Sequence, residues 1–188
     1  MSAPALSVCV PCFNEAGIIE ATAARLLECV PTAGVPSFEV VFCNDGSADD
    51  TGQRLERLAA ADPRIVALGY PVNRGAGRAF RTALARARGE TVVHMDADLA
   101  MDPVEVVRAV QGGLAAGHDL VICSRYKGVA ADYPLYRRVP SFAYRQIYRL
   151  LLGLPVEDFA WLLGQRRSPV VAYLPPKLLV GGRRLVRR

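Results

Sequence analysis

With 188 residues, 52% hydrophobic, and a net charge of +5, the chain is long enough to bury one sizeable core and too short for two ordinary domains. No apolar run approaches the roughly 18 residues of a membrane-spanning helix, so we do not expect the chain to span a bilayer. Residues 1–124 hold 10 basic and 15 acidic side chains, whereas residues 125–188 hold 13 basic and 3 acidic ones. The acidic first part suits a metal ion, and the basic second part suits an anionic partner such as phosphate, nucleic acid or a lipid headgroup.

Short apolar runs of strand length alternate with helical stretches from residue 6 onwards. The predicted strands are residues 6–10, 38–43, 65–69, 91–95 and 120–123. The first predicted helix carries Ile18, Thr22, Leu26 and Val30 on one face, and further helices are expected at 50–61, 76–88 and 103–116. Such alternation predicts βαβ units, and therefore an α/β fold with a mostly parallel central sheet flanked by helices.

Ligands of parallel sheets bind beyond the carboxyl ends of the strands, and unusual polar residues gather at those ends here. The segments that follow the predicted strands are PCFNE at 11–15, NDGS at 44–47, DAD at 96–98 and SRY at 124–126. Their coincidence on one edge predicts that the chemistry takes place there.

Cys9 and Cys12, at the end of the first predicted strand, have the Cys-x-x-Cys spacing of a redox or zinc half-motif. No second pair has metal-site spacing, and five cysteines, an odd number, argue against a disulfide framework. We therefore interpret these thiols as small hydrophobic side chains of the core.

The second strand is followed by Asp45, Gly46 and Ser47. A carboxylate at this position can accept a base N–H or a ribose hydroxyl, and Gly46 permits the sharp turn that would leave Asp45 pointing into the cleft. Ser47 with Asp50 is a plausible capping box for the next helix, which is the purely structural interpretation of this stretch.

Before the third predicted helix, the NRGAG stretch at 73–77 places Gly75 and Gly77 beside Arg74 and Arg78. Glycines allow close backbone approach, and a helix N-terminus with an arginine suits a diphosphate. The alternative is a tight loop with solvated arginines.

Asp96 and Asp98 follow the fourth predicted strand, and two carboxylates one residue apart can face one pocket. Mg²⁺ or Mn²⁺ needs few protein oxygens when water and substrate phosphates complete its shell. The alternative is a solvated acidic turn. Asp102, with Pro103 and Glu105 after it, is instead expected to cap a helix.

Four motifs resemble family 2 glycosyltransferases in order and spacing: VPCFNE at 10–15, NDGSAD at 44–49, NRGAG at 73–77 and MDADL at 95–99. SRY at 124–126, Arg137, Arg138, Ser141 and VED at 156–158 are similar to the dolichyl-phosphate mannose synthase and polyprenyl-phosphate sugar transferase branch. The resemblance covers about residues 5–158. It implies a Rossmann-like GT-A nucleotide-diphospho-sugar transferase fold for residues 1–158.

The resemblance also implies roles for individual residues. The donor's nucleotide would be bound by Pro11, Phe13, Asn14, Glu15, Asp45, Gly75, Gly77 and Asp96. The divalent metal would be held by Asp98 and Asp96, and the acceptor phosphate would face Arg125, Arg138 and Ser141, with Asp96, Asp98 and Arg125 as the catalytic residues. One departure is Ala100, where mannose synthases often have glutamine, which puts the strength of metal binding in question.

The implied reaction is inverting transfer of a hexose from GDP-mannose or UDP-glucose to a polyprenyl or dolichyl phosphate. A lipid phosphate is already anionic near neutral pH, so the absence of an obvious general base is no obstacle.

Without a secretory signal after Met1, the protein is expected in the cytoplasm, at the cytoplasmic face of the membrane. Residues 139–152 form either an interfacial helix or a core helix. No nucleic acid partner is expected.

Two other functions stay open at this level. A donor-binding module without catalysis would result if the acceptor side is incomplete, because residues 159–188 diverge from the family and are basic and aperiodic. We expect a truncation or a reading-frame change there. A sugar-nucleotide nucleotidyltransferase would want a glycine-rich basic loop after the first strand, and PCFNE at 11–15 supplies none.

Overall fold

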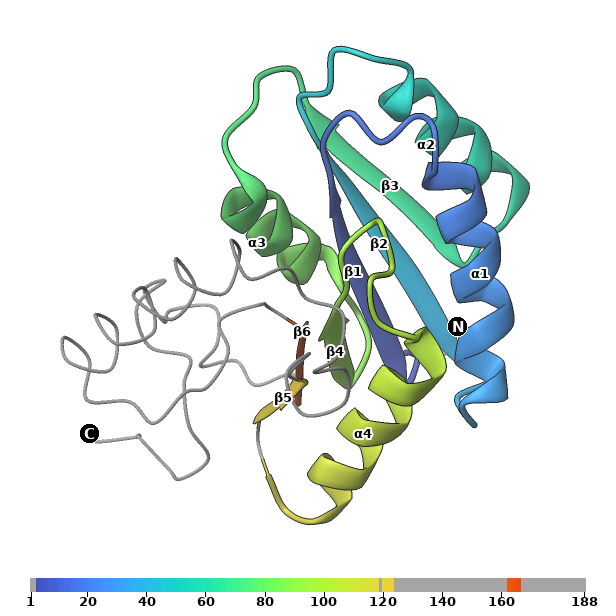
Figure 1. The fold of residues 1–188 in the computed structure, drawn as a ribbon, viewed down its shortest axis with the longest axis vertical. Coiled ribbons are helices and arrows are strands. Elements are labelled where there is room, and N and C mark those ends of the chain that lie inside the picture. The colour runs from blue at the N-terminus through green and yellow to red at the C-terminus, as the bar shows by residue number, and fades with distance from the viewer. Residues whose placement is uncertain (1–2, 119, 124–161, 167–188) are drawn as a thin grey trace, which may run out of the picture.

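The computed structural model describes residues 3–118, 120–123 and 162–166, which build one six-stranded sheet with helices on both faces (Figure 1). The strands are β1 (Leu6–Cys12), β2 (Phe38–Asp45), β3 (Ile65–Tyr70), β4 (Thr91–His94), β5 (Leu120–Cys123) and β6 (Leu162–Arg166). Their order in the sheet is β3-β2-β1-β4-β6-β5. Within the described residues, no helix is long and apolar enough to cross a bilayer.

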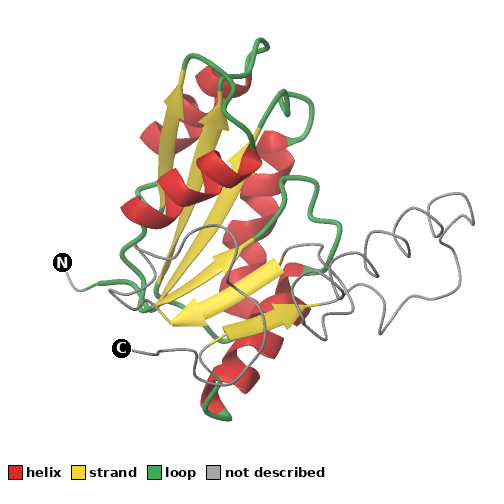
Figure 2. Cartoon of the chain, turned by 90° about the vertical axis from the view of Figure 1, so that its left-hand side faces the viewer, coloured by secondary structure: helices red, strands yellow, loops and turns green. Residues whose placement is uncertain are grey.

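Strands β1 to β4 are mutually parallel, as the alternation of strands and helices predicts. On β1, Pro11 lies opposite Cys43 of β2, and Cys9 lies opposite His94 of β4. Since β4 ends at His94, Pro11 pairs only toward β2, and a residue without a backbone N–H is tolerated there. The carboxyl ends of these strands therefore meet at one edge (Figure 2).

Helices α1 (Ile19–Thr32), α2 (Thr51–Ala61) and α4 (Pro103–Ala115) cover one face of the sheet, and α3 (Ala76–Arg86) covers the other (Figures 1 and 2). The period-two alternation of β1 divides its side chains between two cores. Val8 and Val10 pack on the side of α1 and α4, whereas Cys9 packs with Ala79 and Ala83 of α3. The small alanines let α3 lie close to the strands.

The Cys9 and Cys12 thiols lie on opposite faces of β1, because residues three apart on a strand alternate sides. All five cysteines are free and buried. Burial, with the nearby charge of Glu39, raises the pKa of Cys9 to about 12, and burial likewise raises the pKa of Cys12. The interpretation as core side chains is confirmed, and a redox or zinc pair is excluded.

Strand β6 was not predicted from the sequence. It lies between β4 and β5 and runs antiparallel to both, with Gly164 opposite Val93 on one side and Val121 on the other. It falls within the segment 159–188, whose residues show no clear period. A strand of five residues that lies between two others takes its conformation from its neighbours, so its own sequence pattern carries little signal.

At the amino edge of the sheet, Glu39 of β2 is 1% exposed and fastens the turn between α3 and β4. Its carboxylate accepts from the Ser7 hydroxyl at 2.7 Å and from the backbone N–H of Arg88 at 2.6 Å. The Arg88 guanidinium adds an ion pair at 2.7 Å. A Cβ on Gly89 would lie 2.5 Å from the Ser7 nitrogen, so only glycine allows this close approach.

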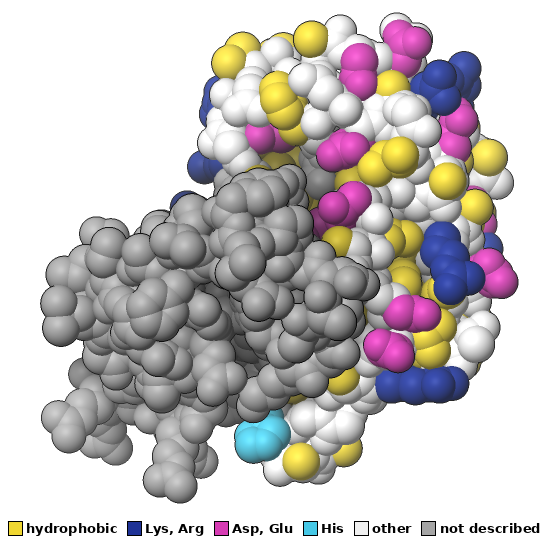
Figure 3. All heavy atoms as spheres, in the orientation of Figure 1, with side chains coloured by type: hydrophobic (Ala, Val, Ile, Leu, Met, Phe, Trp, Pro, Cys, Tyr) yellow, Lys and Arg dark blue, Asp and Glu magenta, His cyan; other side chains and the backbone are white. Residues whose placement is uncertain are grey.

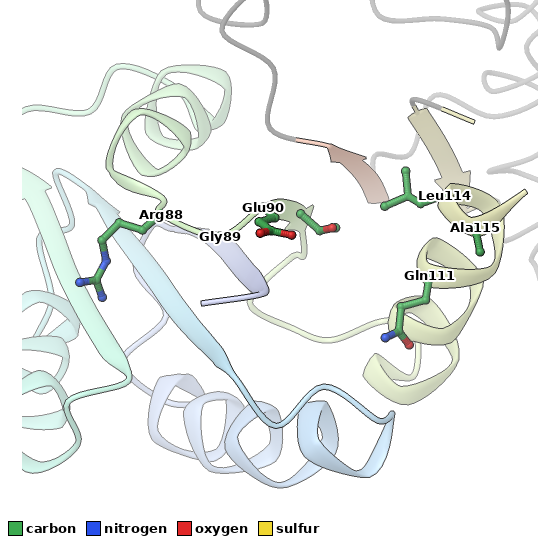
Figure 4. A pocket seen from close by; sticks show the side chains of 7 residues that line it. Arg88, Gly89, Glu90, Gln111, Leu114 and Ala115 are labelled. Atoms are coloured by element: carbon green, nitrogen blue, oxygen red, sulfur yellow. The ribbon is translucent and has the colours of Figure 1, made fainter. Parts of the chain in front are cut away.

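A hollow of about 690 Å³ opens at this same edge, between the α3–β4 turn and α4 (Figure 4). Its lining consists of Arg88, Gly89, Glu90, Thr91, Gln111, Leu114 and Ala115. In Figure 4 the Arg88 guanidinium is directed away from the hollow, in agreement with its ion pair to Glu39. Because the hollow lies opposite the carboxyl edge, it is distinct from the edge where parallel sheets bind their ligands.

Candidate functional site

Three of the four segments predicted to carry the chemistry, at 11–15, 44–47 and 96–98, lie at the carboxyl ends of the parallel strands β1, β2 and β4, and therefore at one edge of the sheet (Figure 2). The fourth, SRY at 124–126, lies outside the described residues. Within this edge the exposures differ. Phe13 is 46% exposed, Pro11 and Glu15 are half-buried, and Asp45 is 2% exposed. Gly75, Gly77 and Asp98 are exposed.

The loop after β1 and the loop after β2 are joined by hydrogen bonds in both directions. The backbone N–H of Asn14 donates to Ser47 Oγ at 2.9 Å, and the backbone N–H of Ala48 donates to Asn14 Oδ1 at 2.9 Å. The predicted capping box of Ser47 and Asp50 is wrong, because the Ser47 hydroxyl serves the neighbouring loop and α2 begins without a side-chain cap. Asn14 itself has φ 57°, in the left-handed region that asparagine tolerates.

Asp45 points inward and fastens the loop after β3, because its carboxylate accepts from the backbone N–H of Arg74 at 2.8 Å. Gly46 has φ 68°, which confirms the predicted sharp turn. A Cβ on Gly46 would overlap backbone atoms of Val72 and Asn73, so glycine also lets the two loops pack closely. Burial, with the carboxylate of Asp45, raises the pKa of Tyr70 in this same cluster.

The loop after β4 is held in a defined turn. The backbone N–H of Leu99 donates to the Asp96 carbonyl oxygen at 3.1 Å, and the backbone N–H of Ala100 donates to Asp98 Oδ1 at 3.1 Å. Between the two aspartates, the buried Ala97 accepts at its carbonyl oxygen from Thr22 Oγ1 at 2.6 Å. Helix α1 therefore fixes the position of the aspartate pair.

Asp96 and Asp98 are placed differently within that turn. The Asp96 side chain is 42% exposed, and its Oδ1 lies 3.9 Å from Nε2 of the largely buried His94, whose ring packs 4.5 Å from that of Phe80. Asp98 is exposed, and its carboxylate is oriented by the Ala100 amide.

Carboxylates from three loops converge at this edge. The pKa of Glu15 is raised by its burial and by the negative charges of Asp98 and Asp49. Acidic side chains lie over the strand-end loops at the top of Figure 3. Carboxylate oxygens are the ligands that Mg²⁺ and Mn²⁺ prefer, so the Asp96 and Asp98 pair fits a cation that takes one or two ligands from the protein. In residues 3–118, 120–123 and 162–166, no group of three or more His, Cys, Asp or Glu could hold a metal, so water and phosphate oxygens would complete the shell.

We expect Glu15→Gln to raise the melting temperature slightly, by about 1–2 °C at pH 7.5, because it removes a charge held near Asp98 and Asp49. The same change should weaken donor binding, since the carboxylate is lost. Scanning calorimetry of both proteins without ligand measures the first effect. A melting temperature below that of the wild type would show that Glu15 makes a net stabilising contact instead.

The N-terminus of α3 presents backbone to this edge. Gly75 is the N-cap residue with φ 89°, and no side chain caps the helix, so Gly75 and Gly77 leave the first turn open. The Arg74 guanidinium lies 5.6 Å from the centre of the Tyr70 ring. This geometry suits a phosphate group approaching the helix N-terminus.

Of the other predicted residues, one has a structural role and three lie outside the described part of the chain. Asp102 caps α4, with its side chain accepting from the backbone N–H of Val104 at 2.7 Å, as predicted. Arg125, Arg138 and Ser141 lie outside the described residues, as does the predicted helix at 139–152. The sequence did not indicate that Thr22, Asp49 and Thr51 support the site, as their hydrogen bonds in the structure show.

The sequence profile of Glycosyl transferase family 2 matches residues 7–170. This chain belongs to that family. It is 36% identical over 155 residues to glycosyltransferase AglD of Haloferax volcanii, covering 81% of this chain and 25% of that protein. It is 34% identical over 143 residues to the bactoprenol glucosyl transferase of Shigella phage SfV, covering 74% of this chain and 45% of that protein. The chain thus spans less than half the length of these two relatives.

Solved structures confirm the GT-A glycosyltransferase fold. The chain superimposes with a TM-score of 0.61 and 25% identity on glucosyl-3-phosphoglycerate synthase from Mycobacterium tuberculosis in complex with Mn²⁺, UDP-glucose and phosphoglyceric acid, covering 87% of this chain and 56% of that one. The chain also superimposes on a mannosyltransferase from Pyrobaculum calidifontis in complex with GDP-Man and Mn²⁺. The TM-score is 0.58 with 24% identity, and the match covers 89% of this chain and 46% of that one.

Proposed function

We propose that this chain is the donor-binding and catalytic domain of a metal-dependent inverting glycosyltransferase that moves a hexose from a nucleotide-diphosphate sugar to a polyprenyl or dolichyl phosphate. The observation that carries the proposal is the meeting of the loops after β1, β2 and β4 at the carboxyl edge of the sheet. Hydrogen bonds join Asn14 to Ser47 and Ala48, and Thr22 of α1 holds the turn that carries Asp96 and Asp98. Membership of family 2 and the similarity to a bactoprenol glucosyl transferase support it.

On the donor side, Asp98 and Asp96 are the proposed ligands of Mg²⁺ or Mn²⁺, which supplies charge stabilisation to the departing diphosphate. The nucleoside and diphosphate are assigned to Pro11, Phe13, Asn14, Glu15, Asp45, Gly75, Gly77 and Asp96. Asp45 is 2% exposed, so its contact with the nucleoside requires a shift of the β3–α3 loop that its carboxylate holds.

On the acceptor side, Arg125, Arg138 and Ser141 are the proposed contacts of the lipid phosphate. A phosphate monoester is anionic near pH 7 and attacks the anomeric carbon without a general base, so the protein's task is positioning and charge stabilisation. The ten net positive charges of residues 125–188 favour contact with an anionic membrane surface. We therefore place the protein peripherally at the cytoplasmic face of the membrane.

The test is a transfer assay with labelled UDP-glucose or GDP-mannose, MnCl₂ and undecaprenyl phosphate in detergent. We expect a chloroform-soluble labelled glycolipid whose formation stops on addition of EDTA. Thermal stabilisation by a nucleotide sugar with Mn²⁺, without any product, would instead support a binding module that lacks catalysis. Neither product nor stabilisation with either nucleotide sugar would contradict the proposal.

A further inference from the structure

The loop after β1 is held along three consecutive backbone amides by side chains that come from one other loop. The N–H groups of Asn14, Glu15 and Ala16 donate to Ser47 Oγ at 2.9 Å, Thr51 Oγ1 at 2.8 Å and Asp49 Oδ2 at 3.1 Å, respectively. The three acceptors lie 33 to 36 residues further along the chain. We call the four side chains that join the loops, Asn14, Ser47, Asp49 and Thr51, the clasp.

Asp49 and Thr51 form the centre of the clasp. Asp49 Oδ1 accepts from both the backbone N–H and the hydroxyl of Thr51, while its Oδ2 accepts from Ala16. Thr51 is the first residue of α2 and is completely buried, so its hydroxyl has a fixed direction. α2 has no side-chain cap at Asp50, and Asp49 accepts both from the first amide of α2 and from the neighbouring loop.

The clasp opposes two unfavourable features of the loop that it holds. Asn14 has a left-handed backbone at φ 57°, and the half-buried Glu15 carries its charge near the carboxylates of Asp98 and Asp49. A loop without these bonds would relax to move Glu15 away from the like charges. Such a site would have to be reordered each time a cation and a nucleotide bind.

We propose that Asp49 and Thr51 are positioning residues that fix the backbone of Glu15 and Ala16 at the carboxyl edge, so that the nucleotide sugar and its cation meet a loop already in place. The inference rests on the proposed function of this edge and adds two residues that support the donor site without touching the donor. Supports of this kind contribute to affinity through the groups that they orient.

Thr51→Val tests the inference, because valine keeps the buried shape and removes the hydroxyl. Isothermal titration of UDP-glucose and of GDP-mannose, each in 1 mM MnCl₂, should show about tenfold weaker binding for Thr51→Val. Thr51→Ser restores the hydroxyl and should bind within about twofold of the wild type. The matched control is Thr82→Val, whose hydroxyl donates only within α3, to the Arg78 carbonyl oxygen at 3.0 Å, and it should bind as the wild type does. In the transfer assay, KM for the donor should rise more than kcat falls.

Each outcome decides the matter. Wild-type affinity in Thr51→Val, or equal weakening in Thr82→Val, overturns the positioning role. If Thr51→Val does not fold, Asp49→Asn takes its place, since this exposed side chain loses one of its carboxylate acceptors and should still weaken binding about fivefold. Wild-type affinity in that variant likewise overturns the inference. Failure of the wild type itself to bind either nucleotide sugar would instead contradict the proposed function of the site.

Discussion

Asp98→Asn should lower kcat/KM of sugar transfer by at least about 100-fold with the fold intact. The amide is a poorer ligand for a hard cation, and the substitution removes one of the charges that face Glu15. Because that charge is unfavourable in the absence of a cation, the melting temperature of the variant without ligand should equal or exceed that of the wild type. Initial rates with saturating undecaprenyl phosphate and varied donor, together with scanning calorimetry, measure both effects.

The matched control is Asp102→Asn, the same substitution four residues along the chain. Asp102 caps α4 through the amide of Val104, and asparagine caps a helix about as well as aspartate. Its activity and melting temperature should therefore stay close to those of the wild type. Near-normal activity of Asp98→Asn in MnCl₂, or an equal loss in Asp102→Asn, would remove Asp98 from the reaction.

Glu39→Gln should lower the free energy of unfolding by about 2–3 kcal/mol, and the melting temperature by about 5–10 °C, without changing the affinity for the donor. The carboxylate is buried and accepts from Ser7 and from both the backbone and the side chain of Arg88. The amide that replaces it would offer one acceptor oxygen where the carboxylate offers two. The Arg88 guanidinium is half exposed, and this keeps the loss below that of a fully buried ion pair.

The effect of Glu39→Gln should depend on pH in a defined direction. Burial by itself would raise the pKa of Glu39, but the hydrogen bonds from Arg88 and Ser7 and the charge of Arg88 hold it below its usual 4.5. A carboxylate with a lowered folded-state pKa stabilises the protein above the unfolded value and loses this contribution as the pH falls through the folded value. Wild type and variant should differ fully at pH 7 and converge below about pH 4.5. Glu56→Gln, an exposed site on α2, is the control, and a similar shift in it would contradict a special role for Glu39.

Much of the fold could be predicted from periodicity, because strands and helices of βαβ units follow local patterns. The predicted helix at 50–61 corresponds to α2 at Thr51–Ala61, and that at 76–88 to α3 at Ala76–Arg86. Strands β1 and β2 extend two residues beyond their predicted ends, to Cys12 and Asp45, since pairing between neighbouring strands continues past the apolar run. Strand β6 could not be predicted, because its conformation depends on β4 and β5 at both sides.

The candidate site was predictable in its composition and less so in its contacts. Asp96 and Asp98 could be singled out because two carboxylates follow a buried strand, and their location at the carboxyl edge follows from topology. The burial of Asp45 could not be foreseen, since it depends on the hydrogen bond from the Arg74 amide of another loop. Ser47 was expected to cap a helix, and only the position of Asn14 shows that it bonds across loops instead.

The sequence by itself determined the α/β class, the parallel direction of the first four strands, and the edge at which the polar motifs gather. These features follow from apolar periodicity and strand direction, which can be read within short windows of the chain. Only the tertiary structure decided which distant groups form hydrogen bonds, such as the Glu15 amide with Thr51 Oγ1 and the Arg88 guanidinium with Glu39. Their partners lie 36 and 49 residues away, and a hydrogen bond of fixed length and direction forms between them only after the crossovers have brought the loops together.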